Sequence, residues 1–377
     1  MRVVVAIDSF KGSLSSIEAG NAVKESVRRL YKDAKVIVKP LADGGEGTVD
    51  ALSSGLDSEM IKICVNGPLM SRVVAKYCIL KHSNTAVIEM AAAAGITLVR
   101  AEERNPLETT TYGVGELIRD AIARGCRRFI VGIGGSATND GGTGMLTALG
   151  FEFLNKNNRP IPLGAKGLKD LFKIRTDNVI PELKECIFNI ACDVKNPLCG
   201  ENGCSTVFAP QKGATTEMIE DMDAWLNNYA NLAKNISSKA DKNYAGAGAA
   251  GGLGFAFLSF TNATLKSGIE IVLEETKIEN HIKEADIVVT GEGRLDSQTV
   301  MGKAPIGVAR LAKKYKRPVI AFSGCVTEDA EICNEYGIDA FFPIVRGVVT
   351  LEEALDPANA YKNLKATAYQ VFRLLSF

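Results

Sequence analysis

The sequence contains very little histidine, which limits the chemistry open to it. Only His82 and His281 occur among 377 residues. Neither has a second His or a Cys at the spacing of a metal-binding motif. A zinc site needs several such ligands, and a serine hydrolase needs a His beside its nucleophile. The scarcity argues against both, so proton transfer must use carboxylates, lysines or water.

Net charge and long apolar runs are also lacking. The 44 Lys and Arg residues equal the 44 Asp and Glu residues, so no general attraction to nucleic acid or to an anionic membrane is expected. No apolar run approaches the roughly 18 residues that suggest a membrane span. The apolar start of the chain stops at Asp8, which favours a buried strand over a signal peptide. Nine scattered Cys residues without a Cys-x-x-Cys repeat predict reduced thiols and a cytoplasmic location.

What the chain does contain is an alternation of strands and helices at both ends. Val3–Ile7 and Lys35–Lys39 are predicted strands, and a capping box at Ser15–Glu18 opens the helix between them. Toward the C-terminus, strands are predicted at residues 286–290, 318–322 and 340–345, with helices at about 303–315, 328–336 and 364–375. Alternating strands and helices predict an α/β fold with a parallel sheet covered on both faces.

Neither end of the chain can form a complete sheet alone. Together, two N-terminal and three C-terminal strands give a five-stranded, doubly wound parallel sheet. We therefore predict one discontinuous domain, residues 1–55 and 285–377, interrupted by a large inserted domain, residues 56–284. The insert is expected to be a second α/β domain, with strands at 86–90, 128–133 and 187–192 and helices at 113–124 and 216–234.

Polar and glycine-rich segments follow the predicted strands, where an open parallel sheet binds its ligands. They are Asp8–Ser13, Asp43–Thr48, Gly134–Gly142, Asp193–Asn196 and Gly291–Asp296. Glycine lets backbone N–H groups approach phosphate oxygens, carboxylates hold Mg²⁺, and basic side chains offset phosphoryl charge. One such segment could be only a turn, but five at strand ends indicate a phosphoryl-transfer site.

Better-known glycine motifs fit poorly. Gly132–Ala137 matches G-x-G-x-x-A, but Thr138–Gly142 would break the helix that dinucleotide binding requires. Gly246–Gly251 matches G-x-G-x-x-G after a polar stretch rather than a strand, and is interpreted as a loop that opens a helix at 253–260. Gly302–Ala304 lacks the Ser or Thr of a P-loop. A nicotinamide-dependent dehydrogenase of a small hydroxy acid is therefore kept only as an alternative.

Longer segments give a specific resemblance. The segments are Asp8–Lys11, Leu41–Thr48, Glu89–Ala93, Gly132–Gly144, Ala191–Val194, Pro210–Gly213, Gly246–Gly254, Lys266–Gly268 and Thr290–Lys303. In them the chain resembles the bacterial glycerate kinases of the first type, in the expected order over nearly its whole length. The resemblance implies a flavodoxin-like domain with a large inserted α/β domain and a site in the cleft between them. It also implies ATP and Mg²⁺, D-glycerate as acceptor and 2-phosphoglycerate as product, with 3-phosphoglycerate not excluded.

Catalytic and substrate-binding roles follow as hypotheses. Asp193 is the first candidate for the base that accepts the hydroxyl proton, and Asp43 is the second. Arg294 is expected to hold the carboxylate of glycerate through its planar guanidinium group. Lys11 could bind carboxylate or phosphate. Further substrate-binding residues are Asp8, Ser9 and Asp296.

The nucleotide and the metal ion are assigned to other residues. The phosphates of ATP are expected at Gly134, Gly135, Ser136, Asn139, Asp140 and Gly141, with Lys303. The candidate Mg²⁺ ligands are Asp43, Glu46 and Glu292. No nucleic-acid or membrane partner is expected, and a homodimer is possible. A non-enzymatic glycerate sensor is the second alternative, because doubly wound folds also serve as binding modules.

Overall fold

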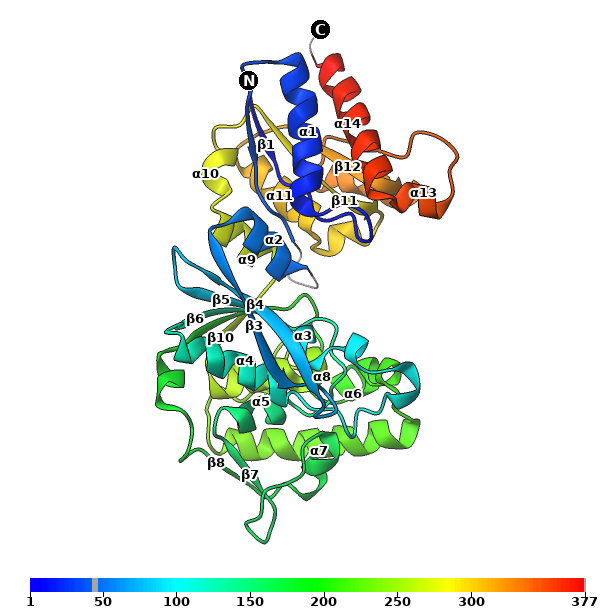
Figure 1. Cartoon of the computed structure of the whole chain (residues 1–377). Helices are drawn as coiled ribbons and strands as arrows, with labels where there is room; N and C mark the ends of the chain where they lie inside the picture. Colours follow the sequence, from blue (N-terminus) through cyan, green and yellow to red (C-terminus); the bar gives the residue numbers. More distant parts are fainter. Residues whose placement is uncertain (43–46, 376–377) are drawn as a thin grey trace. The chain divides into compact units, whose positions relative to one another are not determined.

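The computed structural model describes residues 1–42 and 47–375 (Figure 1). The chain divides into two compact units. One contains most of the chain before Leu56 together with the chain from Ile269 onward, and the other contains Asp57–Gly268. Among the described residues, no helix combines the length and the apolar character needed to cross a lipid bilayer.

The first unit is built on a five-stranded parallel sheet in the order β13-β12-β11-β1-β2. Its strands are β1 (Arg2–Val5), β2 (Lys35–Val38), β11 (Ile287–Leu295), β12 (Val319–Val326) and β13 (Ala340–Pro343). Counted along the chain within this unit, the order is 2-1-3-4-5, which is the flavodoxin-like arrangement. The predicted doubly wound α/β fold is therefore confirmed, and each of its five predicted strands is present.

Helices cover this sheet because its strands are apolar on both faces. The helices in this part of the chain are α1 (Ser16–Leu30), α2 (Thr48–Gly55), α9 (Gly268–Thr276), α10 (Glu279–Ile282), α11 (Ala304–Lys314), α12 (Ile332–Glu335), α13 (Leu351–Leu355) and α14 (Pro357–Leu374). Ser15 and Glu18 form the predicted capping box of α1. Helices α1 and α14 lie side by side (Figure 1), and their buried residues share one core with Val3, Val5 and Ile7 of the first strand region. Leu375, the last residue of the helix predicted at 364–375, is the exposed C-cap of α14.

The second unit contains a six-stranded mixed sheet in the order β10-β9-β6-β5-β4-β3. Its strands are β3 (Ser58–Asn66), β4 (Arg72–Leu80), β5 (Thr85–Glu89), β6 (Arg128–Gly132), β9 (Ile187–Ala191) and β10 (Asn262–Lys266), and a separate hairpin pairs β7 (Glu152–Leu154) with β8 (Lys173–Arg175). Strands β5, β6, β9 and β10 are parallel, whereas β3 and β4 add an antiparallel edge. The sequence predicted β5, β6 and β9 but not the others.

The described residues of this unit also form α-helices. These helices are α3 (Ala91–Ala94), α4 (Tyr112–Ala123), α5 (Thr143–Ala148), α6 (Cys204–Phe208), α7 (Thr216–Lys234) and α8 (Ala249–Phe260). The start of α8 has left-handed backbone at Ala250, Gly251 and Gly252, so regular helix begins at Leu253 as predicted. A Cβ atom at Gly251 would come within 2.1 Å of the Thr138 carbonyl oxygen. Only glycine therefore permits this turn to pack against the loop after β6.

Candidate active site

A cavity of about 440 Å³ lies in the first unit, beside the carboxyl ends of β1 and β11. These strands are neighbours, and their chain connections run to opposite sides of the sheet, which is where doubly wound folds bind ligands. Six residues predicted from sequence line the cavity: Asp8, Ser9, Lys11, Glu292, Arg294 and Lys303. Apolar side chains, among them Phe10, Ile344 and Leu355, line the rest of it. The structure thus brings together polar residues that are nearly 300 positions apart in sequence.

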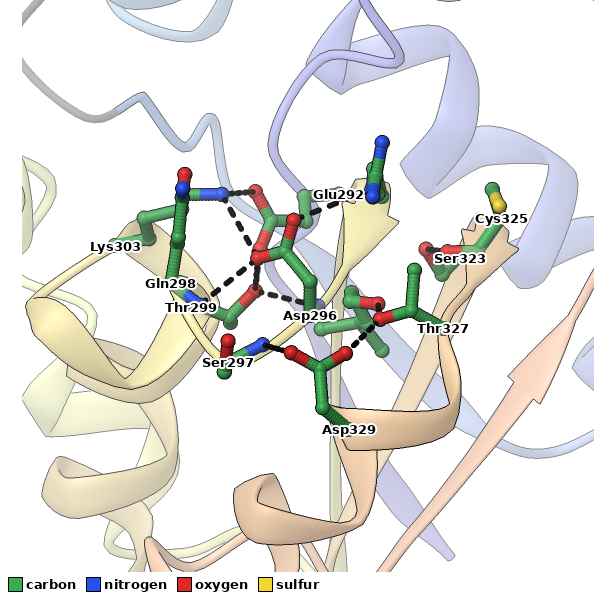
Figure 2. A network of polar contacts seen from close by, with 12 residues as sticks. Glu292, Asp296, Ser297, Gln298, Thr299, Lys303, Ser323, Cys325, Thr327 and Asp329 are labelled. Carbon is green, nitrogen blue, oxygen red and sulfur yellow. Dashed lines mark hydrogen bonds and ion pairs between the residues drawn. The ribbon is translucent and has the colours of Figure 1, made fainter.

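Charged side chains form a connected network at the polar side of this cavity (Figure 2). The Lys303 Nζ atom lies 3.8 Å from Glu292 Oε2 and 3.5 Å from Asp296 Oδ1. Thr299 Oγ1 donates a 2.7 Å hydrogen bond to Glu292 Oε1, and Arg294 Nε lies 3.2 Å from Asp296 Oδ2. The two carboxylates are largely buried, but the Arg294 side chain is 64% exposed. Arg294 is therefore accessible to an anion from solution.

Asp8 and Ser9 lie shortly after β1, beyond Ala6 and Ile7. Asp8 is buried, and its Oδ1 atom accepts a 2.7 Å hydrogen bond from the Ser9 backbone N–H. The Asp8 backbone N–H donates to the Gly291 carbonyl at 2.9 Å. These bonds tie the first strand to the segment that carries Glu292 and Arg294, so the polar wall of the cavity is fixed at its base.

A second cavity, of about 290 Å³, lies entirely within the other unit. Gly132 of β6 is paired with Ala191 of β9 in register, so the segments that follow these parallel strands emerge at one edge. Gly134, Gly135 and Ser136 after β6, and Asp193 after β9, all line the cavity. Asp193 is exposed, and its Oδ1 atom accepts a 3.3 Å hydrogen bond from the Gly268 backbone N–H. The candidate base thus lies beside the candidate phosphate loop.

The remaining residues of that loop are buried behind the cavity. Asn139 is fully buried and donates to Ser205 Oγ at 2.9 Å. Gly141 is also buried, and its N–H donates to the Gly251 carbonyl at 2.9 Å. Neither residue lines the cavity, so we interpret both as supports that hold the loop rather than as ligand contacts.

Asp140 is the centre of this buried support. Its carboxylate accepts hydrogen bonds from five donors: Thr110 Oγ1, Thr111 N, Thr111 Oγ1, Gly142 N and Gly144 N. Burial raises the pKa of this carboxyl, and the bonds from Thr111, Gly142 and Gly144 oppose that shift. We interpret Asp140 as a support of the loop rather than a nucleotide contact, because its carboxylate joins the start of α4 to the loop before α5 through all five bonds.

Lys212 also lines the second cavity, although the sequence assigned it no role. It ends a short 3₁₀ helix, Pro210–Lys212. Its Nζ atom donates to Ser136 Oγ at 2.8 Å and to the Thr138 carbonyl at 2.7 Å. The segment Pro210–Gly213 was noticed only as part of the family resemblance. A lysine normally lies at the surface, so nothing in the sequence separated this one from the others.

Comparison with known proteins identifies the family. Residues 3–376 match the glycerate kinase family. The chain belongs to this family. It is 46% identical over 377 residues to a glycerate kinase of Haemophilus influenzae, covering 100% of this chain and 99% of that protein. A glycerate 2-kinase of Escherichia coli K12 is 46% identical over 97% of this chain and 95% of its own.

A solved structure agrees with this assignment. A crystal structure of a protein assigned as glycerate kinase 2 from Salmonella typhimurium LT2 matches with a TM-score of 0.92 and 45% identity, covering 100% of this chain and 98% of that chain. The predicted membership of the glycerate kinase family and the predicted kinase class of enzyme are confirmed. Membership of a kinase family also argues against the dehydrogenase and sensor alternatives.

The predicted Mg²⁺ ligands of this glycerate kinase family member can be compared with the structure. Two of the predicted ligands, Asp43 and Glu46, lie outside the described residues. Among residues 1–42 and 47–375, no three His, Cys, Asp or Glu side chains gather in a way that could hold a metal ion. Mg²⁺ in kinases is usually held by one or two carboxylates plus substrate phosphates. Glu292, with Asp296 nearby, fits that mode better than a metal cage built from protein alone.

Proposed function

We propose that this chain transfers the γ-phosphoryl group of ATP to a hydroxyl of D-glycerate and yields 2-phosphoglycerate. Full-length similarity to a relative named glycerate 2-kinase supports the acceptor and the position of transfer. The observation that carries the proposal is that each unit presents one polar cavity at strand ends: one with an accessible guanidinium group, the other with a carboxylate beside a glycine loop. The guanidinium group suits the carboxylate of the acceptor, the glycine loop suits the phosphates of the donor, and the carboxylate can accept a proton.

We further propose that the two units are a discontinuous domain and its insert, and that the reaction uses residues of both. In this proposal the insert ends near residue 268, where the chain returns to the first domain, rather than at residue 284. Glycerate binds Arg294, Asp8 and Ser9, with Asp296 positioning Arg294 through their ion pair. The ATP phosphates bind the loop Gly134–Ser136. Lys303 belongs with the glycerate side of the site, because its partners are Glu292 and Asp296.

The protein residues then have few chemical tasks, because phosphoryl transfer depends mainly on positioning and charge. Asp193 accepts the hydroxyl proton as the glycerate oxygen forms its bond to the γ-phosphorus, with Asp43 as the alternative base. The bond from that phosphorus to the β–γ bridging oxygen breaks, and ADP leaves. Lys11 offsets charge on the transferred group. Mg²⁺, held by Glu292 with Asp43 and Glu46 as further candidates, would neutralise phosphate charge.

The cellular setting is also a proposal. All nine cysteines are free thiols, which supports a reducing, cytoplasmic location. Small molecules, ATP and D-glycerate, are the proposed partners, and a homodimer stays a prediction.

A coupled assay tests the reaction itself. Purified protein with ATP, Mg²⁺ and D-glycerate should release ADP, whereas L-glycerate should give much slower release. Phosphorus and proton NMR of the product should show the phosphate on carbon 2. Release of ADP without a phosphorylated glycerate, or a phosphate on carbon 3, would reject the corresponding part of the proposal.

Arg294 gives the sharpest test of where glycerate binds. Arg294→Met should raise KM for glycerate by about 10–100-fold, because a charge-assisted hydrogen bond is worth roughly 1.5–3 kcal/mol. KM for ATP should change by less than about threefold. Arg28→Met, which removes an exposed arginine of α1 in the same unit, is the matched control and should change neither constant. A rise confined to KM for ATP would reverse the assignment of the two cavities.

A further inference from the structure

Lys212 is a buried cation without an anionic partner. Its residue exposure is only 2%, and it is among the largest fully buried side chains of the protein. Both of its hydrogen-bond acceptors, Ser136 Oγ and the Thr138 carbonyl, are neutral. Isolated charges are expensive to bury, and folds normally pair them. An unpaired lysine that lines a cavity therefore points to a counter-charge supplied by a ligand.

The described residues supply no direct ion-pair partner for Lys212. Within the described part of the chain, no carboxylate oxygen lies within 4.0 Å of the Lys212 Nζ atom. Asp140 stabilises the charge of Lys212 through space, but it makes no direct ion pair with it, and its carboxylate bonds five donors of its own. A protonated lysine carries three N–H donors, and two are used. One donor is left for a molecule in the cavity.

The backbone of Gly134–Ser136, beside Lys212, also offers N–H donors to an anion. The Gly135 carbonyl accepts a 2.9 Å hydrogen bond from the Ile96 N–H. The Ala137 N–H donates a 2.9 Å hydrogen bond to the Ala94 carbonyl. By contrast, the successive N–H groups of Gly134, Gly135 and Ser136 donate to no acceptor among the described residues. Gly135 has φ +73°, the left-handed conformation that lets adjacent N–H groups converge on one anion.

The Ser136 hydroxyl is oriented by the same contact. Because its oxygen accepts from Lys212, its hydrogen is available to donate elsewhere, and Ser136 lines the cavity. The cavity thus combines a lysine, a hydroxyl and three successive N–H groups. Donors of this number and arrangement suit the several oxygens of a phosphate chain better than a single carboxylate.

We propose that Lys212 is the buried cation of a phosphate-binding cradle, in which it binds the nucleotide phosphate chain and positions Ser136 and the Gly134–Gly135 backbone. This inference rests on the proposed kinase function. It adds to that proposal the residue that supplies positive charge at the glycine loop.

The pH dependence of nucleotide binding provides a signature. Burial lowers the pKa of Lys212 to about 8, so the lysine loses its charge as the pH rises above 8. The nearby Cys204 and Cys192 thiols have pKa values raised to about 12 and about 11, mainly by burial, so both stay neutral through that range. Asp140 and Asp193 are the nearby carboxyls. ADP affinity should therefore fall by up to about tenfold for each pH unit above 8.

Nucleotide binding to the full chain is the direct test, with ADP titrated calorimetrically at pH 7 in the presence of Mg²⁺. Lys212→Met should weaken ADP binding at least tenfold and raise KM for ATP similarly, with KM for glycerate nearly unchanged. It should also abolish the fall in affinity above pH 8. Lys242→Met is the matched control, because Lys242 is a half-buried lysine of the same unit that bonds Asn227 outside the cavity.

A second variant keeps the test decisive should Lys212→Met fail to fold, as judged by circular dichroism. Ser136→Ala removes one partner of the lysine, and ADP affinity should fall about two- to tenfold while the pH dependence persists. Unchanged ADP affinity in the folded variants, a flat pH profile in the wild type, or a rise in KM for glycerate alone would overturn the inference. A wild-type chain that binds ADP in this way but does not phosphorylate glycerate would overturn the proposed acceptor and leave the cradle standing.

Discussion

Asp193→Asn is expected to lower kcat by about 10²–10⁴-fold, the range contributed by a positioned general base. The amide keeps the size of the side chain and an oxygen that can accept from the Gly268 N–H, but it cannot take up the hydroxyl proton. Because Asp193 is exposed, the folded structure should be preserved. The measurement is kcat at saturating ATP and D-glycerate, with thermal unfolding followed in parallel.

Asp223→Asn is the control for this result. Asp223 lies in the same unit, accepts a 2.9 Å hydrogen bond from the Gly200 N–H, and does not line the cavity. Its replacement should leave kcat within about twofold. Near wild-type turnover in Asp193→Asn would remove Asp193 from the role of base and transfer that role to Asp43.

Asp140→Ala is expected to destabilise the protein by about 3–5 kcal/mol, because it leaves buried donors without their acceptor and opens a cavity. The orphaned groups would include the Thr111 hydroxyl and the backbone N–H groups of Thr111, Gly142 and Gly144. The measurement is the free energy of unfolding from urea denaturation followed by circular dichroism. Among the expected effects on stability, this one is the largest.

The matched change is Asp223→Ala. Asp223 is half-buried and accepts a hydrogen bond from the Gly200 backbone N–H. Its replacement should cost no more than about 1–1.5 kcal/mol. A loss below about 1 kcal/mol in Asp140→Ala would show that Asp140 does not support the loop. Nucleotide contact, as the sequence alone suggested, would then be the better explanation for this residue.

The flavodoxin-like sheet could be predicted because its physical signal is local. Strands such as Val3–Ile7 are continuous apolar runs, as expected of parallel strands buried on both faces. Strand β3 (Ser58–Asn66) was missed because the exposed charged residues Glu59 and Lys62 interrupt its apolar run. Within the described residues, β3 pairs only with its neighbour β4 at the edge of the sheet, where a strand need not be apolar on both faces.

The candidate site was predictable in its chemistry but not in the task of each residue. Strand ends locate ligand-binding segments, which is why the sequence could single out Asp8, Glu292 and Arg294, three residues that line one cavity. Polar residues that hold a loop and polar residues that hold a ligand are of the same types, so Asp140 could not be separated from Ser136 by sequence. The burial of Lys212 is a tertiary property, created by the packing of the 3₁₀ helix Pro210–Lys212 against the loop after β6.

A crystal structure of the full chain with D-glycerate and a non-hydrolysable ATP analogue with Mg²⁺ tests the central claim most directly. The account predicts one site, with the glycerate carboxylate on Arg294, the phosphate chain on Lys212 and the Gly134–Ser136 loop, and the acceptor hydroxyl within hydrogen-bond distance of Asp193. The two ligands should meet so that this hydroxyl faces the γ-phosphorus. The account would be contradicted if the two ligands bound in separate cavities open to solvent, with no contact between glycerate and Arg294 or between the phosphate chain and Lys212.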